Sequence, residues 1–456
     1  MKAPASFLLT LFLLVSAVWG AALPKKRGSF QIKGVTGSRG HQDPLAALRY
    51  AYRKFGIHAP DNVTAAAEGL GLSTNSAFKL GIVNKHAKGR KTGNGNTGNT
   101  AGTGATVNDT GADDGSEEGE VPAESIDDRF FLSPVRVGSQ TLMLNLDTGS
   151  SDFWVFSTGL PAELRAGHEA YDPNRSQTFE PLEGSTFSIT YGDGSAAEGV
   201  VGFETVDFGG STVDRQAIGL ATDVSGLLTQ DVLSDGLVGL AFSSLNTIQP
   251  VPQKTFFENL LPDLDEPVMT VLLKSEAEGG VGSYEFGRID PTKFTGNLIE
   301  VPVDNSRGHW EIDTPSFKVG SRDARAQQIQ ITPTAIVDTG TTLMLASPEL
   351  VQSYYRAVDG AQVLSGDGSV AFPCDAELPP LFVQVGRGPN HYVEIPSEAM
   401  NFGPVGTDPT TGQTLCFGGL QSNQGFELQI YGGVFLRNLF AVFNHEKPSI
   451  SLAPQA

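Results

Sequence analysis

Two short sequence elements occur twice in this chain, in the same order and at nearly the same spacing. The stretch Leu-Asn-Leu-Asp-Thr-Gly-Ser at 144–150 is echoed by Ala-Ile-Val-Asp-Thr-Gly-Thr at 335–341. The second element, two largely apolar residues and a glycine, occurs further along the chain in each copy. Its glycine lies 92 residues after the aspartate in the first copy and 94 in the second. The matched spacing predicts two related lobes, each built around one copy of both elements.

The local pattern is that of a mainly β protein. After residue 128 the chain consists largely of short β-branched or aromatic runs separated by Gly, Pro, Asn and Asp, and few stretches favour a helix. At 456 residues the chain is too long for one small core. We therefore expect a bilobal β fold, with an N-terminal lobe at 121–303 and a C-terminal lobe at 304–456.

Residues 1–20 are expected to be a secretory signal peptide. Lys2 supplies the positive start, an apolar run follows at 7–18, and small residues come after it. The run is too short to span a bilayer, and no later stretch is long and apolar enough to do so. The sequence predicts a secreted protein without a membrane partner, and we expect it to be a monomer.

The chain has two cysteines, Cys374 and Cys416. In an exported protein such a pair favours a disulfide over a metal site or a nucleophile. The seven histidines show none of the spacings typical of metal ligands. We expect a disulfide, and we expect neither a metal nor another cofactor.

The net charge of −20 conceals a division within the chain. Residues 1–108 hold 14 Lys and Arg against three acidic residues, whereas the remainder carries a net charge of −31. A large negative field disfavours nucleic acid as a partner of the main body. The charges instead indicate a basic N-terminal segment that lies on an acidic body.

Residues 21–120 are predicted to form a propeptide and a flexible linker. Asp43 can cap a helix that has Pro44 in its first turn and ends at Gly56. The stretch 92–120 is rich in Gly, Asn and Thr and ends acidic, so it cannot bury a core. Arg90-Lys91 offers a dibasic cleavage site before it. One helical face carries Leu45, Leu48, Tyr52 and Phe55, and cations are supplied by Arg49, Arg53 and Lys54.

The triplet Asp-Thr-Gly occurs three times, and its context separates the copies. Asp109 lies in the polar linker with no apolar strand before it. At Asp147 and Asp338 an apolar strand leads into the triplet, and a hydroxyl residue, Ser150 or Thr341, follows three positions after the aspartate. That hydroxyl can donate to the carboxylate and fix its orientation. Structural Asx turns are the alternative reading, but two copies in this context favour a functional pair.

If the lobes pack symmetrically, the carboxylates of Asp147 and Asp338 meet. Two carboxylates in contact cannot both ionise easily, so they share one proton over an acidic pH range. The ionised member can then take a proton from a bound water that attacks a peptide carbonyl, while the protonated member stabilises the developing oxyanion. This chemistry needs neither a metal nor a covalent intermediate.

Residues 128 to 456 resemble the pepsin family of aspartic proteases, and in particular its secreted fungal members of the penicillopepsin and endothiapepsin type. The resemblance implies a bilobal acid protease fold with the active site in a cleft between the lobes. The stretches that carry it are Asp-Thr-Gly-Ser-Ser-Asp-Phe-Trp-Val at 147–155, Tyr-Gly-Asp-Gly-Ser at 191–195, Asp-Gly-Leu-Val-Gly-Leu-Ala-Phe at 235–242 and Asp-Thr-Gly-Thr-Thr at 338–342.

The resemblance implies roles for these residues. Thr148 and Thr339 would brace the two aspartate loops against each other. A flap at the tip of a β-hairpin would close over an extended peptide, with Tyr191 held by Trp154. The other residues implied in binding substrate are Gly192 and Asp193 at the flap and Gly149, Gly340, Thr341 and Thr342 in the cleft.

The resemblance also implies substrates and inhibitors. Family members prefer bulky apolar residues beside the cut bond, and Asp193 is typical of fungal members that also accept Lys there. Pepstatin-type peptides inhibit the family. Its propeptides place a basic residue against the aspartates until acid releases it, and Lys54 is our candidate for that residue, with Arg53 and Arg49 as competitors.

Two further features belong to the body of the chain. The second lobe of the family usually has Asp after the apolar-apolar-Gly element, but this chain has Gly433 there. We expect the change to affect local hydrogen bonds rather than the chemistry. Asn174 heads an Asn-Arg-Ser sequon and is a candidate for N-glycosylation.

Two other functions compete with proteolysis. The same fold can act as a protein-binding inhibitor after losing its aspartate pair, but both aspartates and both hydroxyl residues are present here. A glycosidase also uses paired carboxylates, but that reading does not explain the duplicated triplets and the flap.

Overall fold

The computed structural model describes residues 30–33, 44–57, 70, 72–75, 123–126, 130–190, 196–225, 228, 234–275, 280–330, 333–364 and 368–456. Several predicted features lie outside these ranges: the signal peptide at 1–20, Asp43, the pair Arg90-Lys91, the linker at 92–120 and the flap tip with Tyr191, Gly192 and Asp193. None of the described helices is long and apolar enough to cross a membrane.

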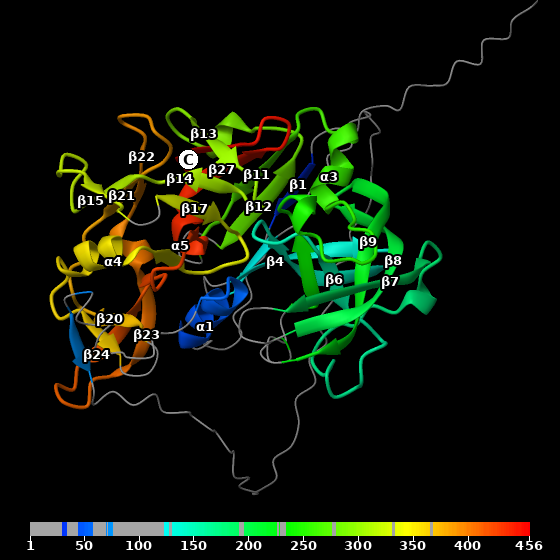
Figure 1. Cartoon of the computed structure of the whole chain (residues 1–456), viewed down its shortest axis with the longest axis horizontal. Helices are drawn as coiled ribbons and strands as arrows, with labels where there is room; N and C mark the ends of the chain where they lie inside the picture. Colours follow the sequence, from blue (N-terminus) through cyan, green and yellow to red (C-terminus); the bar gives the residue numbers. More distant parts are fainter. Residues whose placement is uncertain are drawn as a thin grey trace, which may run out of the picture.

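The prediction of a mainly β protein with two lobes is confirmed. In Figure 1 the strands of the first lobe, coloured cyan to green, lie on one side, and the yellow to orange segments of the second lie on the other. The first lobe is formed by β4 (Phe130–Val137), β5 (Gln140–Asp147), β6 (Phe153–Phe156), η1 (Pro173–Arg175), β7 (Glu180–Thr190), β8 (Ala196–Phe208), β9 (Ser211–Val224), β10 (Gly236–Gly239), η3 (Ser243–Leu245), α3 (Phe256–Leu260) and η4 (Leu261–Asp263).

In its described residues, the second lobe combines several small sheets with α-helices α4 and α5 and the 3-10 helix η7. Its elements are β14 (Glu311–Asp313), β15 (Ser316–Val319), β16 (Gln327–Gln328), β17 (Thr334–Val337), β18 (Met344–Ala346), α4 (Pro348–Tyr355), β19 (Gln362–Leu364), β20 (Val370–Pro373), β21 (Leu381–Gln384), β22 (Tyr392–Ile395), η7 (Ser397–Met400), β23 (Asn401–Thr407), β24 (Thr414–Gly418), β25 (Leu420–Ser422), β26 (Gln429–Tyr431) and α5 (Gly433–Leu436).

An antiparallel sheet with strands from both halves of the chain joins the lobes. Its order is β13, β28, β27, β11, β12 and β1. Strand β3 pairs with the first residues of β12, and β1 pairs with the residues that follow them on the same side of that strand. The proposed lobe boundary after residue 303 falls within β13, before its last residue. The elements are β1 (Phe30–Lys33), β3 (Ala123–Ile126), β11 (Val268–Leu272), β12 (Val281–Phe286), η6 (Pro291–Lys293), β13 (Ile299–Asp304), β27 (Leu439–Asn444) and β28 (Ser449–Pro454).

The repeated sequence elements build the same local topology in each lobe. Strand β5 runs parallel to β10, with Asp147 opposite Gly239, and β17 runs parallel to β26. Strand β6 is antiparallel to β10, as β18 is to β26. A Cβ on Gly239 would lie 2.5 Å from the backbone nitrogen of Asp152, so glycine is needed where this strand passes the aspartate loop.

The helix predicted in the N-terminal segment forms between the lobes. Helix α1 (Pro44–Lys54) appears in blue at the centre of Figure 1, and Gly56 follows it at φ +68°, a left-handed conformation that suits a residue ending a helix. The apolar face packs into the main core: Leu45, Leu48 and Tyr52 are buried and Phe55 is half-buried.

Further along the N-terminal segment, residues 70 and 72–75 also contact the C-terminal lobe. Leu70 is buried in the main core and Leu72 packs against it. The short strand β2 (Ser73–Asn75) then adds in parallel to the edge of β19. The segment before residue 76 therefore contacts the body at the central sheet, between the lobes and at this edge.

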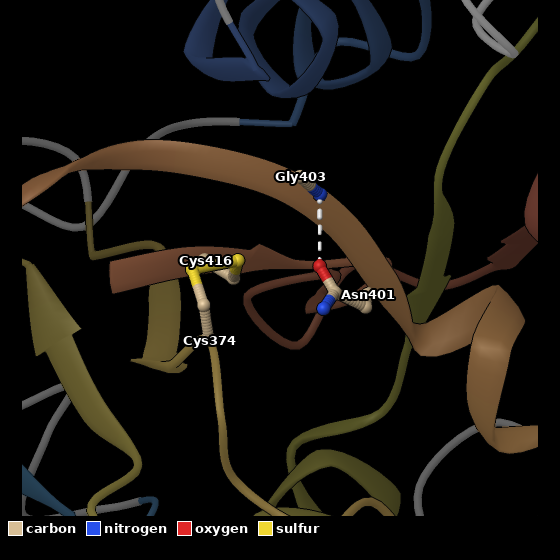
Figure 2. The surroundings of a disulfide bond; sticks show 4 residues. All are labelled: Cys374, Asn401, Gly403 and Cys416. Carbon is tan, nitrogen blue, oxygen red and sulfur yellow. Dashed lines mark hydrogen bonds between the residues drawn. A yellow bond between two sulfur atoms is a disulfide. The ribbon is translucent and has the colours of Figure 1, made fainter. Parts of the chain in front are cut away.

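The two cysteines form a disulfide, as predicted for an exported protein (Figure 2). Cys374 directly follows β20, and Cys416 lies in the neighbouring strand β24. The bond closes a segment with a sequence separation of 42 residues.

Replacing both Cys374 and Cys416 by Ser should lower the free energy of unfolding by about 4 kcal/mol, the loop-closure entropy of a loop of this length. Denaturant unfolding of the full-length chain at neutral pH measures the change. The reduced wild-type protein serves as a control and should match the double variant. Equal stability of the oxidised wild type and the variant would contradict a stabilising role of the bond.

Candidate active site

The two aspartates of the repeated triplets lie at the ends of buried strands. Asp147 is the last residue of β5, and Asp338 directly follows β17. The residues directly before them, Leu146 and Val337, are apolar and buried, and both aspartate side chains have no exposed surface. Strand ends therefore carry one carboxylate from each lobe to the same place.

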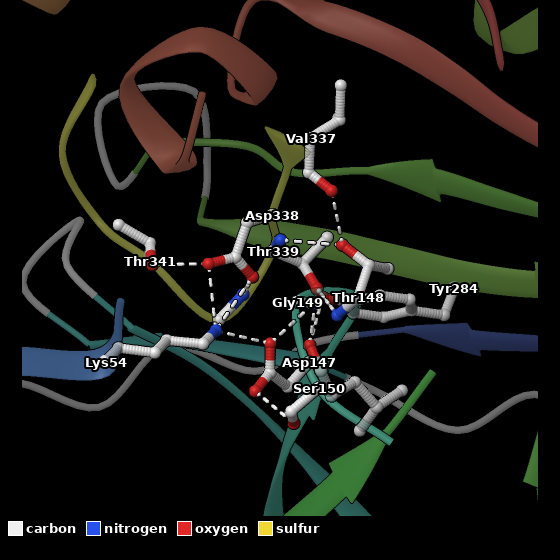
Figure 3. A network of polar contacts seen from close by, with 12 residues as sticks. Lys54, Asp147, Thr148, Gly149, Ser150, Tyr284, Val337, Asp338, Thr339 and Thr341 are labelled. Atoms are coloured by element: carbon white, nitrogen blue, oxygen red, sulfur yellow. Dashed lines mark hydrogen bonds and ion pairs between the residues drawn. The ribbon is translucent and has the colours of Figure 1, made fainter. Parts of the chain in front are cut away.

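Each carboxylate is held by its own loop in the same way. The backbone N–H of Gly149 donates to Asp147 Oδ1 at 2.8 Å, and that of Gly340 donates to Asp338 Oδ1 at 2.9 Å. Ser150 Oγ donates to Asp147 Oδ2 at 2.6 Å, and Thr341 Oγ1 donates to Asp338 Oδ2 (Figure 3). The outer oxygens thus receive the hydroxyl donors that the sequence suggested.

The loops are braced against each other by reciprocal hydrogen bonds. The N–H of Thr148 donates to Thr339 Oγ1 at 3.0 Å, and the N–H of Thr339 donates to Thr148 Oγ1 at 2.9 Å. Each hydroxyl also donates across the interface, from Thr148 to Val337 O at 2.9 Å and from Thr339 to Leu146 O at 2.6 Å. These four buried bonds fix the relative position of the two carboxylates.

The glycines of the triplets permit this approach. A Cβ added to Gly149 would lie 2.6 Å from the carboxylate carbon of Asp338, and one on Gly340 would lie 2.5 Å from that of Asp147. No side chain larger than hydrogen fits where one lobe touches the carboxylate of the other.

The amine of Lys54, the last residue of α1, binds both carboxylates. Its Nζ donates to Asp147 Oδ1 at 2.6 Å and to Asp338 at 2.9 Å (Oδ1) and 2.8 Å (Oδ2). The Lys54 side chain is only 3% exposed. The predicted residue Lys54 therefore lies at the aspartates, and the side chain of its competitor Arg53 is outside the described part of the chain.

Burial and this ion cluster set the protonation of the three groups. Burial alone would raise the pKa of Asp147, but the charge of Lys54 and hydrogen bonds with Asp338, Lys54 and Ser150 outweigh it, so its pKa lies below the ordinary value. Burial and the charge of Asp147 raise the pKa of Asp338 to about 6, against the opposing effect of Lys54. The pKa of Lys54 is raised because the two carboxylates outweigh the burial that would lower it.

Of the remaining predicted site residues, Trp154 and Thr342 lie in the described part of the chain. Trp154 is buried, its ring centroid lies 5.6 Å from that of Phe156, and its Nε1 donates to no acceptor of the described chain. Thr342 is buried beside the second triplet. The hairpin arms β7 and β8 pair as far as Thr190 and Ala196, which flank the undescribed flap tip.

Sequence reasoning gave no role to two buried carboxylates near the first triplet. Asp152 accepts hydrogen bonds from Asn246 Nδ2 at 3.1 Å and from the N–H of Thr247 at 3.0 Å. Asp235 accepts from the N–H of Met143 at 2.9 Å and from that of Glu169 at 2.8 Å. Both aspartates lie in sequence stretches that carry the family resemblance, at 147–155 and 235–242. Short motifs do not reveal which carboxylates become buried.

The sequence also did not predict two residues beside the carboxylates, Tyr284 and His309. Tyr284 OH donates to Leu146 O at 3.3 Å, behind the first triplet. Burial and the charge of Lys54 lower the pKa of His309 to about 4, so its ring adds no positive charge near the aspartates in weak acid. Both come from stretches without a recognisable motif, so no sequence signal marked them.

The glycine that replaces the usual second-lobe aspartate packs against the second triplet. The N–H of Gly433 donates to Thr341 O at 2.7 Å, and the N–H of Val434 donates to Thr342 O at 2.9 Å. The start of α5 thus supports this loop through backbone bonds. Nowhere in the described ranges do three His, Cys, Asp or Glu side chains gather in a group able to hold a metal ion.

Comparison with known proteins gives consistent matches. The profile of the family "eukaryotic aspartyl protease" matches residues 130–455. A protein of Aspergillus fumigatus described as an aspergillopepsin A-like aspartic endopeptidase is 46% identical over 426 residues, 93% of this chain and 92% of its own. Aspartic protease PEP3 of Coccidioides posadasii is 50% identical over 326 residues, 72% of each chain. Penicillopepsin-1 of Penicillium rubens is 44% identical over 326 residues, 72% of this chain and 78% of its own.

Asp152 and Asp235 should make the fold less stable as the pH rises. Burial raises the pKa of each to about 6, so the folded protein binds more protons than the unfolded chain between about pH 4 and pH 6. Their stabilising contribution is complete below the unfolded pKa and is lost as the pH rises through 6. The loss is on the order of 2 kcal/mol for each carboxylate.

The double variant Asp152→Asn/Asp235→Asn tests this prediction in thermal unfolding from pH 5 to pH 7.5. Its melting temperature should fall less steeply with pH than that of the wild type. Asp214→Asn, which alters an exposed carboxylate, should keep the wild-type slope. Parallel curves for the double variant and the wild type would show that other groups cause the pH dependence.

Proposed function

The chain belongs to the eukaryotic aspartyl protease family, and we propose that it is secreted as an acid-activated precursor in which Asp147 and Asp338 become the catalytic pair. Aspartic endopeptidases of this family act on proteins and peptides. The observation that carries the proposal is that both buried carboxylates, one from each lobe, lie within hydrogen-bonding distance of a single nitrogen atom.

The proposed reaction follows from this proximity. Once Lys54 has left, two adjacent carboxylates hold one proton between them, and the pair titrates as a unit. A water bound between them loses a proton to the ionised member and attacks the peptide carbonyl. The protonated member donates to the developing oxyanion, and proton transfer to the nitrogen then releases the amine.

The supporting residues orient the pair during this reaction. Ser150 and Thr341 would hold the outer oxygens, which leaves the inner oxygens to the water. Thr148 and Thr339 would keep the two carboxylates from separating, because their bonds connect backbone to side chain across the lobes. Loss of a cross-brace should therefore misplace both carboxylates.

Substrate recognition is proposed from the family resemblance. Gly149, Gly340 and Thr342 would bond the backbone of an extended peptide with bulky apolar residues beside the cut. Tyr191, Gly192 and Asp193 would close over it as a flap, with Asp193 pairing with Lys where the substrate offers it. The Nε1 of Trp154, which has no acceptor among the described residues, is the donor that would hold Tyr191. Pepstatin-type peptides should inhibit by occupying the same cleft.

The N-terminal segment up to residue 120 is proposed to be an intramolecular inhibitor. Helix α1 fills the space between the lobes, and Lys54 occupies the position of the catalytic water. As the pH falls, Asp338 takes up its proton at about pH 6, which removes one anionic partner of Lys54. Lys54 lowers the pKa of Asp147, so binding of the N-terminal segment is fully favoured above the ordinary pKa of an aspartate. This binding is lost as the pH falls through the lowered pKa of Asp147.

The proposal places the mature enzyme outside the cell. The N-terminal signal supports export, and the disulfide suits an oxidising compartment. Asn174, in the short η1 helix, is exposed, so the sequon is accessible for glycosylation. We propose a monomer with lobes at 121–303 and 304–456.

Asp147→Asn and Asp338→Asn should each lower kcat by roughly a thousandfold or more, because each removes the shared-proton chemistry. Cleavage of denatured globin at acid pH, with and without pepstatin, measures the effect. Asp109→Asn is a matched control, since it alters the same triplet in the linker and should retain full activity. Substantial pepstatin-sensitive activity in Asp147→Asn would refute the assignment.

Lys54→Met should weaken the latency of the precursor, because Met fills the space without a charge for the carboxylates. At pH 5.5 the initial rate of peptide cleavage by fresh precursor should rise at least tenfold over the wild type. Arg49→Gln removes a cation from the same helix and should stay latent. A Lys54→Met precursor as inactive as the wild type would show that latency has another cause.

A further inference from the structure

A second side chain of α1 binds in a polar site on the C-terminal lobe. Tyr52, two residues before Lys54, is 4% exposed. Its hydroxyl donates to the backbone oxygen of Ser422 at 2.7 Å and accepts from Gln424 Nε2 at 3.1 Å. The phenol therefore meets one acceptor and one donor, and a phenylalanine at this position would satisfy neither.

The loop that holds this phenol is fixed by contacts within the body. The N–H of Asn423 donates to Ala346 O at 2.8 Å, and its side-chain amide donates to Phe426 O at 3.1 Å and Leu428 O at 3.0 Å. The N–H of Gln424 donates to Ser422 Oγ at 3.0 Å. None of these bonds involves the N-terminal segment, so the loop can keep its shape when that segment leaves.

Gln424 itself has an unusual backbone. Its φ of +54° makes it the only residue other than glycine with positive φ in the described part of the chain. This conformation disfavours ordinary side chains and commonly marks functional positions. The residue that adopts this conformation is also the one whose side-chain amide donates to the Tyr52 hydroxyl.

The site lies close to the carboxylates along the sheet of the second lobe. The N–H of Asp338 donates to Tyr431 O at 3.1 Å, and Tyr431 pairs with Met344 of β18. Two residues further along β18, Ala346 pairs with Ser422. Tyr52 and Lys54, two residues apart on α1, reach Ser422 and the carboxylates at the same time, so an extended peptide that reaches the carboxylates needs only a few more residues to reach Ser422.

From this geometry we infer that the Ser422–Gln424 loop is a tyrosine-selective subsite of the mature enzyme, which the precursor fills with its own Tyr52. The inference rests on the proposed function, because it assumes that a substrate takes the place of the N-terminal segment. When Tyr52 leaves, Ser422 O loses its donor and the Gln424 amide loses its acceptor. A substrate tyrosine restores both bonds, whereas phenylalanine leaves both groups without a protein partner.

The test measures kcat/KM of the mature enzyme on peptides that share one cut site and carry Tyr or Phe at each position around it in turn. Tyr should be preferred about tenfold at one position, the value of one to two hydrogen bonds, and should show no such preference elsewhere. Gln424→Met keeps the size of the side chain without the amide, and it should reduce the Tyr-to-Phe ratio severalfold at that position.

Two further variants sharpen the result. Gln424→Gly removes the side chain in a backbone conformation that glycine adopts readily, so it should also lower the ratio without distorting the loop. Gln413→Met makes the same change as Gln424→Met at an exposed glutamine of the same lobe, and it should keep the wild-type ratio.

The outcomes separate this inference from the proposed function. Equal cleavage of Tyr and Phe peptides at every position would overturn the subsite, and so would a Tyr preference that both Gln424 variants retain. In either case the enzyme still cleaves peptides and the endopeptidase assignment stands. A mature protein that cleaves none of the peptides would instead contradict the proposed function.

Discussion

The structure depends on holding two fully buried carboxylates next to each other. Buried charges of like sign repel strongly and lose their hydration, so such a pair persists only if protons, cations or hydrogen-bond donors compensate it. In this chain the compensation is complete: each aspartate has a backbone donor and a hydroxyl donor from its own loop, and Lys54 binds both. The rest of the fold positions these donors.

The two-lobed architecture follows from the same constraint. Each lobe delivers one carboxylate at the end of a buried strand, and the loops are braced by four hydrogen bonds across the interface. The central antiparallel sheet pairs β11 and β13 with β27 and β28, the last two strands of the chain, so the lobes cannot separate without disrupting it. Helix α1 adds the cation of Lys54 to this arrangement.

Much of the fold could be predicted from the sequence because its signals are local or repeated. The helix at Pro44–Lys54 followed from its proline, its apolar face and the glycine after it. The disulfide between Cys374 and Cys416 followed from their number and the predicted compartment. The buried Asp152 and Asp235, with pKa values of about 6, could not be foreseen, because their environment comes from residues distant in the chain.

The sequence by itself determined that this protein has two related lobes, each with a carboxylate at the end of an apolar strand, since the repeated motif and its spacing are written in the chain. It offered Lys54 as the cation at the aspartates without fixing the contacts of that side chain, and it did not reveal that Tyr52 meets Ser422 and Gln424. Only the tertiary structure decided these contacts. They depend on how far α1 enters between the lobes, and a shift of one residue along a helix turns a side chain by about 100°.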